Sequence, residues 1–227
     1  MKYATVILTA LFLQPAFSKT LELGVGLGSF MTNPKGLSGT PTAITVDSST
    51  KVDAAAVLSG RALLFPAEWL GLGMNFDLTA AGSPTMSSTD STLSSYTKYA
   101  LACTSSDAMI SLRLHESKVK GKDWWTNELR LVGMSSVKAN CVLDYGSSNL
   151  YKTDYRNSAT AKSWAAGLEA ATTFFYVFHF GLEAGYRNYK SNGLVDENAQ
   201  PLVDSSGKPV KVDLSAPYFL VNLGFNF

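Results

Sequence analysis

The chain has 227 residues, enough for one large all-β domain, and 16% of them are charged. The formal net charge is only +1, which argues against a nucleic-acid partner. No stretch approaches the ~18 continuous apolar residues that a membrane-spanning helix needs, so a membrane-bound form must cross by strands.

The first 18 residues have the pattern of a secretory signal peptide. Lys2 precedes an apolar run from Val6 to Leu13, Pro15 ends the run, and Ala16-Phe17-Ser18 is a small-x-small cleavage site. The run is too short to span hydrocarbon, which argues against an uncleaved anchor. We therefore predict a cleaved signal over 1–18 and a single domain over 19–227.

After the signal peptide come seven segments in which apolar residues alternate with small or polar ones. They run over 19–30, 51–64, 69–80, 106–116, from 124, 163–174 and 177–189. A terminal segment of the same kind ends the chain. Long polar segments, predicted as loops, cover 31–50, 81–105, 135–162 and 190–210, and they alternate with short turns. Asn127 falls among the outward residues of the fifth segment, so its register stays open. No repeat of fixed length is apparent.

The terminal segment, 211–227, has the strictest alternation. Its large apolar residues share one parity: Phe219, Val221, Leu223, Phe225 and Phe227. Small and polar residues occupy the other parity, including Asn222, Gly224 and Asn226. This pattern is typical of a strand with lipid on one side and a lumen on the other.

A soluble barrel around a ligand would alternate in the same way, with its apolar face inward. The lipid-facing alternative is favoured because the polar faces lack the Lys, Glu and Gln density of a water-exposed surface. Aromatic residues, among them Phe65, Trp69, Trp124 and Trp164, also gather at strand ends, where interfacial girdles lie.

Together these features resemble the small eight-stranded outer-membrane β-barrels of OmpA/OmpX-like architecture. The resemblance implies an all-β, antiparallel up-and-down transmembrane barrel, monomeric, in a bacterial outer membrane. It implies that the insertion machinery of that membrane recognises the terminal segment. It also implies contact with outer-membrane lipids and lipopolysaccharide, and a structural or surface-interaction role in which the extracellular loops meet a ligand.

The lumen of such a barrel is just wide enough for side chains to fill, so charges within it should pair. Candidates for a salt-bridge network lie near mid-height on three neighbouring segments: Glu128, Arg130, Glu169, Glu183 and Arg187. Other charges predicted to face inward are Glu22, Asp53, Arg61, Asp77 and Arg113. A stabilising plug is favoured over the alternative, a narrow gated ion channel.

Cys103 and Cys141 are candidates for a disulfide, because an exported chain meets an oxidising compartment. The two histidines, His115 and His179, are both predicted to face the lumen near the short-turn end. A lipid-modifying enzyme would need a histidine beside a serine on the lipid-facing wall or outer rim, so this third alternative is less favoured. We predict no catalytic residues, no cofactor and no metal site.

Overall fold

The computed structural model describes residues 20–31, 36–38, 54–82, 86–87, 96–147 and 155–227. The strands are β1 (Leu21–Phe30), β2 (Gly36–Leu37), β3 (Ala54–Ala67), β4 (Leu70–Gly82), β5 (Met86–Ser87), β6 (Tyr96–Val119), β7 (Lys122–Ser147), β8 (Tyr155–Phe174), β9 (Phe178–Gly193), β10 (Lys211–Asp213) and β11 (Ala216–Asn226). Within these residues there is no helix long and apolar enough to cross a membrane. The predicted signal peptide and Asp53 lie outside the described residues.

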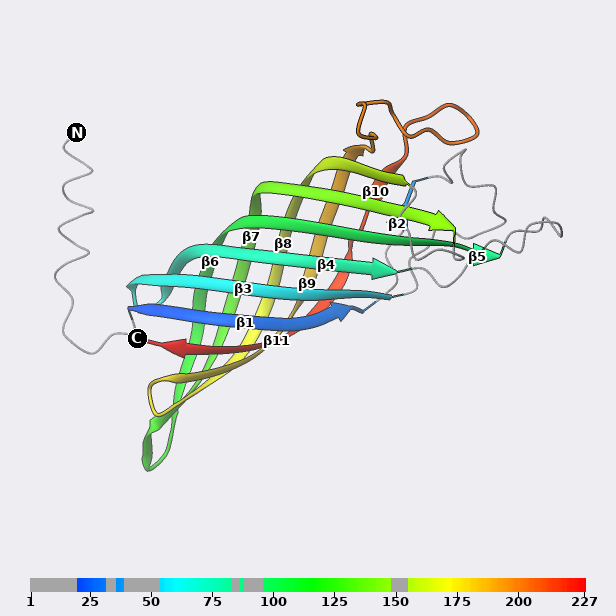
Figure 1. Cartoon of the computed structure of the whole chain (residues 1–227). Coiled ribbons are helices and arrows are strands. Elements are labelled where there is room, and N and C mark those ends of the chain that lie inside the picture. Colours follow the sequence, from blue (N-terminus) through cyan, green and yellow to red (C-terminus); the bar gives the residue numbers. More distant parts are fainter. Residues whose placement is uncertain (1–19, 32–35, 39–53, 83–85, 88–95, 148–154) are drawn as a thin grey trace, which may run out of the picture.

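Eight strands close into one antiparallel ring (Figure 1). Their order is β1-β3-β4-β6-β7-β8-β9-β11, and β11 pairs with β1 to complete the circle. Closure satisfies the backbone groups of both edge strands, which hydrocarbon requires. The predicted eight-stranded up-and-down barrel is confirmed. The short strands β10 and β2 extend β9 at the loop end, and β5 pairs with β6.

The outer wall of the ring is apolar and the inner wall is largely polar. On β11, Leu223 and Phe225 are 54% and 49% exposed, whereas Asn222 between them is 2% exposed. Each of the seven remaining strands of the ring also has exposed apolar residues, including Leu27, Leu64, Phe76, Ile110, Leu131, Leu168 and Phe180. A continuous wall of this kind is stable in hydrocarbon and not in water, so the barrel spans a membrane.

Aromatic residues gather at both ends of this wall. At the short-turn end Trp124 stacks on Phe175, with ring centroids 4.7 Å apart. At the loop end Trp164 lies against Tyr186, with centroids 6.0 Å apart. Phe65, predicted to belong to the girdle, instead points into the lumen, where the Arg130 guanidinium lies 5.7 Å from its ring. A bulge between Leu64 and Ala67 accompanies this inward turn.

The strands are longer than the sequence predicted. Residues 96–105, 135–147 and 155–162, predicted as loops, belong to β6, β7 and β8. In these upper parts the alternation is inverted, because apolar residues such as Leu101 and Leu143 face inward and polar ones face out. A search for apolar residues facing lipid therefore does not detect them.

The β6–β7 hairpin extends past the other turns at the short-turn end, as the green strands of Figure 1 show. A register shift between Arg113 and His115 precedes this extension. His115 lies beyond the shift and is exposed, so its predicted lumenal position is wrong. Asn127 is outward and exposed on the same extension, and the Trp125 indole lies within hydrogen-bonding distance of its side-chain oxygen, at 3.2 Å.

A charge introduced at the middle of the wall should destabilise the barrel more than one near its rim. Leu168 lies between the aromatic ends of β8, and Leu114 lies beside the bulge near the short-turn end. Leu168→Arg should lower the free energy of unfolding by ~2–4 kcal/mol and Leu114→Arg by about 0–1 kcal/mol. Urea unfolding in lipid vesicles measures both. Equal effects would contradict the placement of the membrane.

Candidate functional site

Seven side chains from five strands meet inside the barrel toward the short-turn end, and we call them the lower ion cluster. Its members are Glu22, Arg61, Glu128, Arg130, Glu169, His179 and Glu183. The strand alternation directs each of them inward, and all are buried, Arg130 and Glu169 completely. Burial of unpaired charge would be strongly unfavourable. These side chains can therefore be buried only because they pair with one another.

The ion pairs of this cluster join opposite walls of the barrel. Arg61 on β3 donates to Glu169 on β8, with Nη2 and Oε1 2.7 Å apart. Arg130 on β7 donates to Glu22 on β1, with Nη1 and Oε2 2.9 Å apart. Each pair links strands that lie four places apart in the ring of eight. Glu22 also pairs with Arg61 at 2.8 Å, so the two arginines share the Glu22 carboxylate.

Neutral side chains complete the cluster. Asn222 donates to Glu169 at 3.0 Å and to Glu183 at 3.2 Å, and the Tyr218 hydroxyl donates to Glu183. Nε2 of His179 lies 2.9 Å from Arg61 Nη2, and because a guanidinium only donates, this nitrogen accepts.

A glycine makes room for the cluster. A Cβ at Gly181 would lie 2.3 Å from Glu169 Oε1. Gly181 on β9 therefore leaves room for the long Glu169 side chain of the neighbouring strand β8.

A second set of charges, the upper ion cluster, lies toward the loop end and consists of Asp77, Asp107 and Arg187. Arg187 Nη2 lies 2.5 Å from Asp77 and 3.2 Å from Asp107. The pair of Arg187 on β9 with Asp77 on β4 again crosses the ring. Beside it, the Tyr189 hydroxyl reaches across to the carbonyl oxygen of Thr104 at 2.9 Å.

Four of the five residues that the sequence grouped lie together in the lower ion cluster: Glu128, Arg130, Glu169 and Glu183. Arg187 lies in the upper ion cluster instead. The sequence grouping omitted Glu22 and Arg61 from this network, because residues distant along the chain become neighbours only across a closed ring. It did not identify Asp107, which belongs to a stretch where the outward face is no longer clearly apolar.

The loop end has an apolar core inside the barrel. Cys103 and Cys141 are direct cross-strand partners on β6 and β7, and they form a disulfide. Both are fully buried, as are Leu194 and Leu214, which cover them from the connection between β9 and β11. The disulfide therefore lies within this core.

The connection that covers this core contains a tandem repeat. Residues 194–201 and 202–209 both read Leu-Val-Asp-x-x-x-x-Pro, so the expectation that the chain has no repeat of fixed length is wrong. In each octad the aspartate Oδ1 accepts two backbone N–H groups, from Asn198 and Gln200 or from Ser206 and Lys208. The octads form two similar tight turns, visible as the orange loops of Figure 1.

The two octad turns are tied together by their backbones. The N–H of Leu202 donates to Leu194 O, that of Val210 to Leu202 O, and that of Leu194 to Val210 O, each at 2.8 Å. The left-handed conformation that the turns require falls on Gly207 in one octad and on Ala199 in the other, at φ 76° and 61°. We call residues 194–214 the cap.

Among the residues described, no group of three or more His, Cys, Asp and Glu side chains is arranged to hold a metal ion. His179 is buried within the lower ion cluster and His115 is exposed on the hairpin, so the two histidines occupy unrelated environments.

Removal of one charge from the lower ion cluster should destabilise the barrel strongly. Arg130→Met leaves Glu22 and Glu128 without their shared partner and should lower the free energy of unfolding by ~3–5 kcal/mol. Arg156→Met provides the control, because Arg156 is 63% exposed and lies 3.6 Å from Asp144. That change should have an effect below ~1 kcal/mol. Denaturant titration in detergent micelles compares the two, and similar losses would refute the role of the cluster.

The second octad turn should be sensitive to acid. Hydrogen bonds from the Ser206 hydroxyl and from the backbone N–H groups of Lys208 and Ser206 lower the pKa of Asp204. Because the pKa is lower in the folded protein, the ionised carboxylate stabilises the turn at pH values above the unfolded pKa of about 3.9. This stabilisation is lost as the pH falls through the folded pKa. NMR titration should place the Asp204 midpoint below the unfolded value, with the Lys208 amide losing exchange protection at that pH. Asp204→Asn should abolish the transition, and a midpoint at or above the unfolded value would contradict it.

No protein-family model and no curated protein sequence matches the chain. Among solved structures it is similar to Ail, the attachment invasion locus protein of Yersinia pestis, in complex with the heparin analogue sucrose octasulfate. That alignment has 12% identity and a TM-score of 0.45, and it covers 93% of this chain and 100% of Ail. An outer-membrane channel from Pseudomonas putida F1 aligns at 9% identity and a TM-score of 0.25, covering 95% of this chain and 100% of the channel. These likenesses decide nothing about function.

The conclusion about architecture comes from the barrel itself. It has an even number of antiparallel strands, a lipid-facing apolar wall, aromatic girdles at both ends and short turns at one end. These are the properties of bacterial outer-membrane barrels. The chain is an eight-stranded outer-membrane β-barrel protein.

Proposed function

We propose that the protein is a sealed, non-conducting outer-membrane barrel that presents its capped loop end as a surface for interaction. The observation that carries this proposal is the filling of the lumen. The charged side chains of the two ion clusters are all buried, and none is more than 8% exposed. A water path would leave some of these groups exposed.

Four sets of side chains fill the lumen between its two ends. The lower ion cluster occupies the short-turn end, and Tyr218, hydrogen-bonded to Glu183, belongs to an apolar cluster with Met109, Val132 and Leu220. The upper ion cluster follows, and the apolar core with its disulfide lies at the loop end. An ion would have to displace paired guanidinium and carboxylate groups and then cross an apolar layer, which favours a plug over a gate.

The cap supports an interaction role because it is folded and exposes polar side chains at its tips. Glu197, Asn198 and Gln200 are exposed on the first octad turn, and Lys208 on the second. A preorganised surface binds with less loss of conformational entropy than a flexible loop. The partner is an extracellular ligand that contacts these polar groups.

Three further expectations belong to the same proposal. The outward row Phe219, Val221, Leu223, Phe225 and Phe227 on and beside β11 serves as the insertion signal read by the assembly machinery. A monomer is favoured because closure of the ring by β1 and β11 pairs both terminal strands.

A lipid-modifying enzyme is disfavoured, since His179 is enclosed by the lower ion cluster and His115 lies on the projecting hairpin.

Planar bilayer recordings test the seal directly. The refolded protein, checked for the heat-modifiable mobility of a folded barrel, should give no stepwise conductance at moderate voltage and neutral pH. A porin recorded in the same membranes shows that channels would be seen. Reproducible steps that change in size or ion selectivity in Glu183→Ala would overturn the proposal and establish the gated-channel alternative.

A further inference from the structure

The lumen widens at the short-turn end into a polar cavity of about 420 Å³, which we call the vestibule. Short turns mark the periplasmic side of an outer-membrane barrel, so the vestibule opens toward the periplasm. Its walls come from β6, β7 and β11 and from the turn between β3 and β4. The polar residues that the argument uses are Glu68, Arg113, Glu116, Lys118, Glu128 and Asn226.

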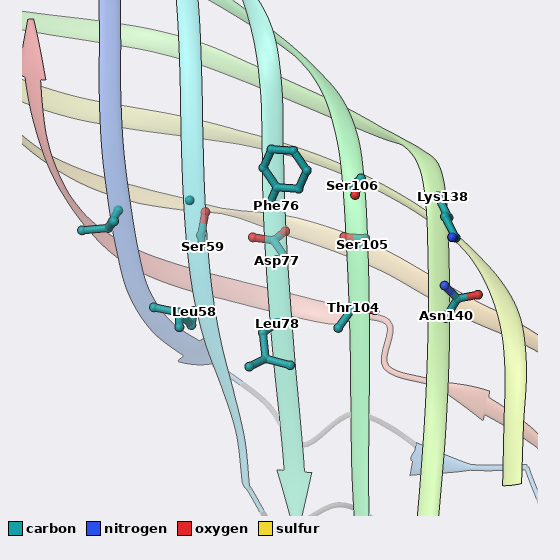
Figure 2. Close-up of a pocket in the computed structure, with 12 residues that line it drawn as sticks. Leu58, Ser59, Phe76, Asp77, Leu78, Thr104, Ser105, Ser106, Lys138 and Asn140 are labelled. Atoms are coloured by element: carbon teal, nitrogen blue, oxygen red, sulfur yellow. The ribbon is translucent and has the colours of Figure 1, made fainter.

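The vestibule differs from a hollow of about 550 Å³ on the outer wall near the loop end. Figure 2 shows Leu58, Phe76 and Leu78 along that hollow, which crosses β3, β4, β6 and β7. These side chains belong to the apolar wall and face hydrocarbon, whereas the vestibule faces water. The vestibule is therefore the one of these two hollows that a water-soluble ligand can enter.

A buried hydrogen-bond acceptor without a partner borders the vestibule. Asn226 is the last inward residue of β11, where it pairs in register with Glu22, and it is 5% exposed. Its Nδ2 lies 3.4 Å from Thr173 Oγ1, but within the described chain no donor reaches its Oδ1. A buried acceptor that stays unpaired costs free energy. Asn226 therefore favours a ligand that brings an N–H or O–H donor.

The charges around Asn226 favour a donor that is also a cation. Arg113 is already held by carboxylates, because it pairs with Glu116 and lies 3.3 Å from Glu128. Glu68, exposed at the rim, makes no ion pair with any residue that the structure describes. One carboxylate of the vestibule wall is thus free to meet a cation.

The lower ion cluster directly behind the vestibule adds to its negative potential. The vestibule has three carboxylates and two cations, and the cluster contributes three further carboxylates and two further cations. His179 adds no charge, since its Nε2 accepts from Arg61. A cleft with an excess of one sign concentrates ligands of the opposite sign.

We propose that the vestibule binds a linear aliphatic polyamine from the periplasmic side. One ammonium group donates to Asn226 Oδ1, another lies near Glu68 at the rim, and the exposed ring of Tyr176 offers a face for cation–π contact. Among the described residues no group of three side chains is arranged to hold a metal ion, which favours an organic cation. The inference rests on the outer-membrane orientation and is independent of the sealed lumen.

The two contacts are tested with spermidine as the probe. Wild type and Asn226→Leu/Glu68→Gln, refolded in nonionic detergent, are titrated at low ionic strength by isothermal titration calorimetry. The variant should bind at least about ten-fold more weakly, since it loses a charge-assisted hydrogen bond and the rim carboxylate. The matched control, Asn127→Leu/Asp123→Asn, makes the same kind of change at the same end but outside the vestibule and should bind like wild type.

Folding of each variant is checked by heat-modifiable mobility. Asn226→Leu removes an acceptor that has no partner, so the barrel should fold as before. Glu68→Gln alone changes one exposed side chain and should still weaken spermidine binding several-fold.

Lys118 separates a cationic ligand from an anionic one. Lys118→Gln removes a positive charge from the vestibule wall and should tighten spermidine binding, whereas Lys120→Gln, at the hairpin tip outside the vestibule, should have no effect. Added salt should weaken binding by the wild type.

Three outcomes would overturn the proposal: no saturable binding of spermidine by the wild type, equal affinity of the double variant and the wild type, or weaker binding by Lys118→Gln. Butylamine, which has one ammonium group, should bind more weakly than spermidine, and equal affinity would refute the two-point contact. Conductance by the wild-type barrel would refute the proposed seal without affecting these titrations, so the two ideas fail separately.

Discussion

The ion pairs that cross the lumen are the constraint on which the rest of the structure depends. Arg61 with Glu169, Arg130 with Glu22, and Arg187 with Asp77 each join opposite walls. Because the interior of an eight-stranded ring has room for side chains and little else, these three pairs form only when the ring is closed. The same pairs therefore favour one strand register, fill the barrel and exclude a path for ions.

The chain uses one set of strands in two environments. Along the membrane, apolar residues face out and charges face in, whereas above it Leu101, Cys103, Cys141 and Leu143 face in and polar residues face out. The upper part is thus built like a soluble protein, with an apolar core, a disulfide and a covering segment of two octad turns. The membrane-spanning part supplies the rigid base on which this small core forms.

This inversion explains what could and could not be predicted from the sequence. The strict alternation of 211–227 and the apolar rows of β4 and β9 predict a transmembrane barrel of eight strands, because lipid imposes one polarity on every strand. The upper halves of β6, β7 and β8 have the opposite polarity, so they resemble polar loops when the same rule is applied. The pairing of Arg130 with Glu22 and that of Arg187 with Asp77 depend on which strands face each other across the ring. Separation along the chain, 108 residues for Arg130 and Glu22, contains no such information.

The boundary between the two environments is where the outer wall changes character, and Lys138, Lys162 and Lys190 lie exposed side by side at that boundary. Below it the outward residues of β8 and β9 are mostly apolar, among them Trp164, Leu168 and Tyr186. Above it they are Thr160 and Asn192, which hydrogen-bond to each other at 2.8 Å. This change in the outward residues therefore marks the height at which hydrocarbon ends and the small apolar core inside the upper strands takes over the burial of apolar side chains.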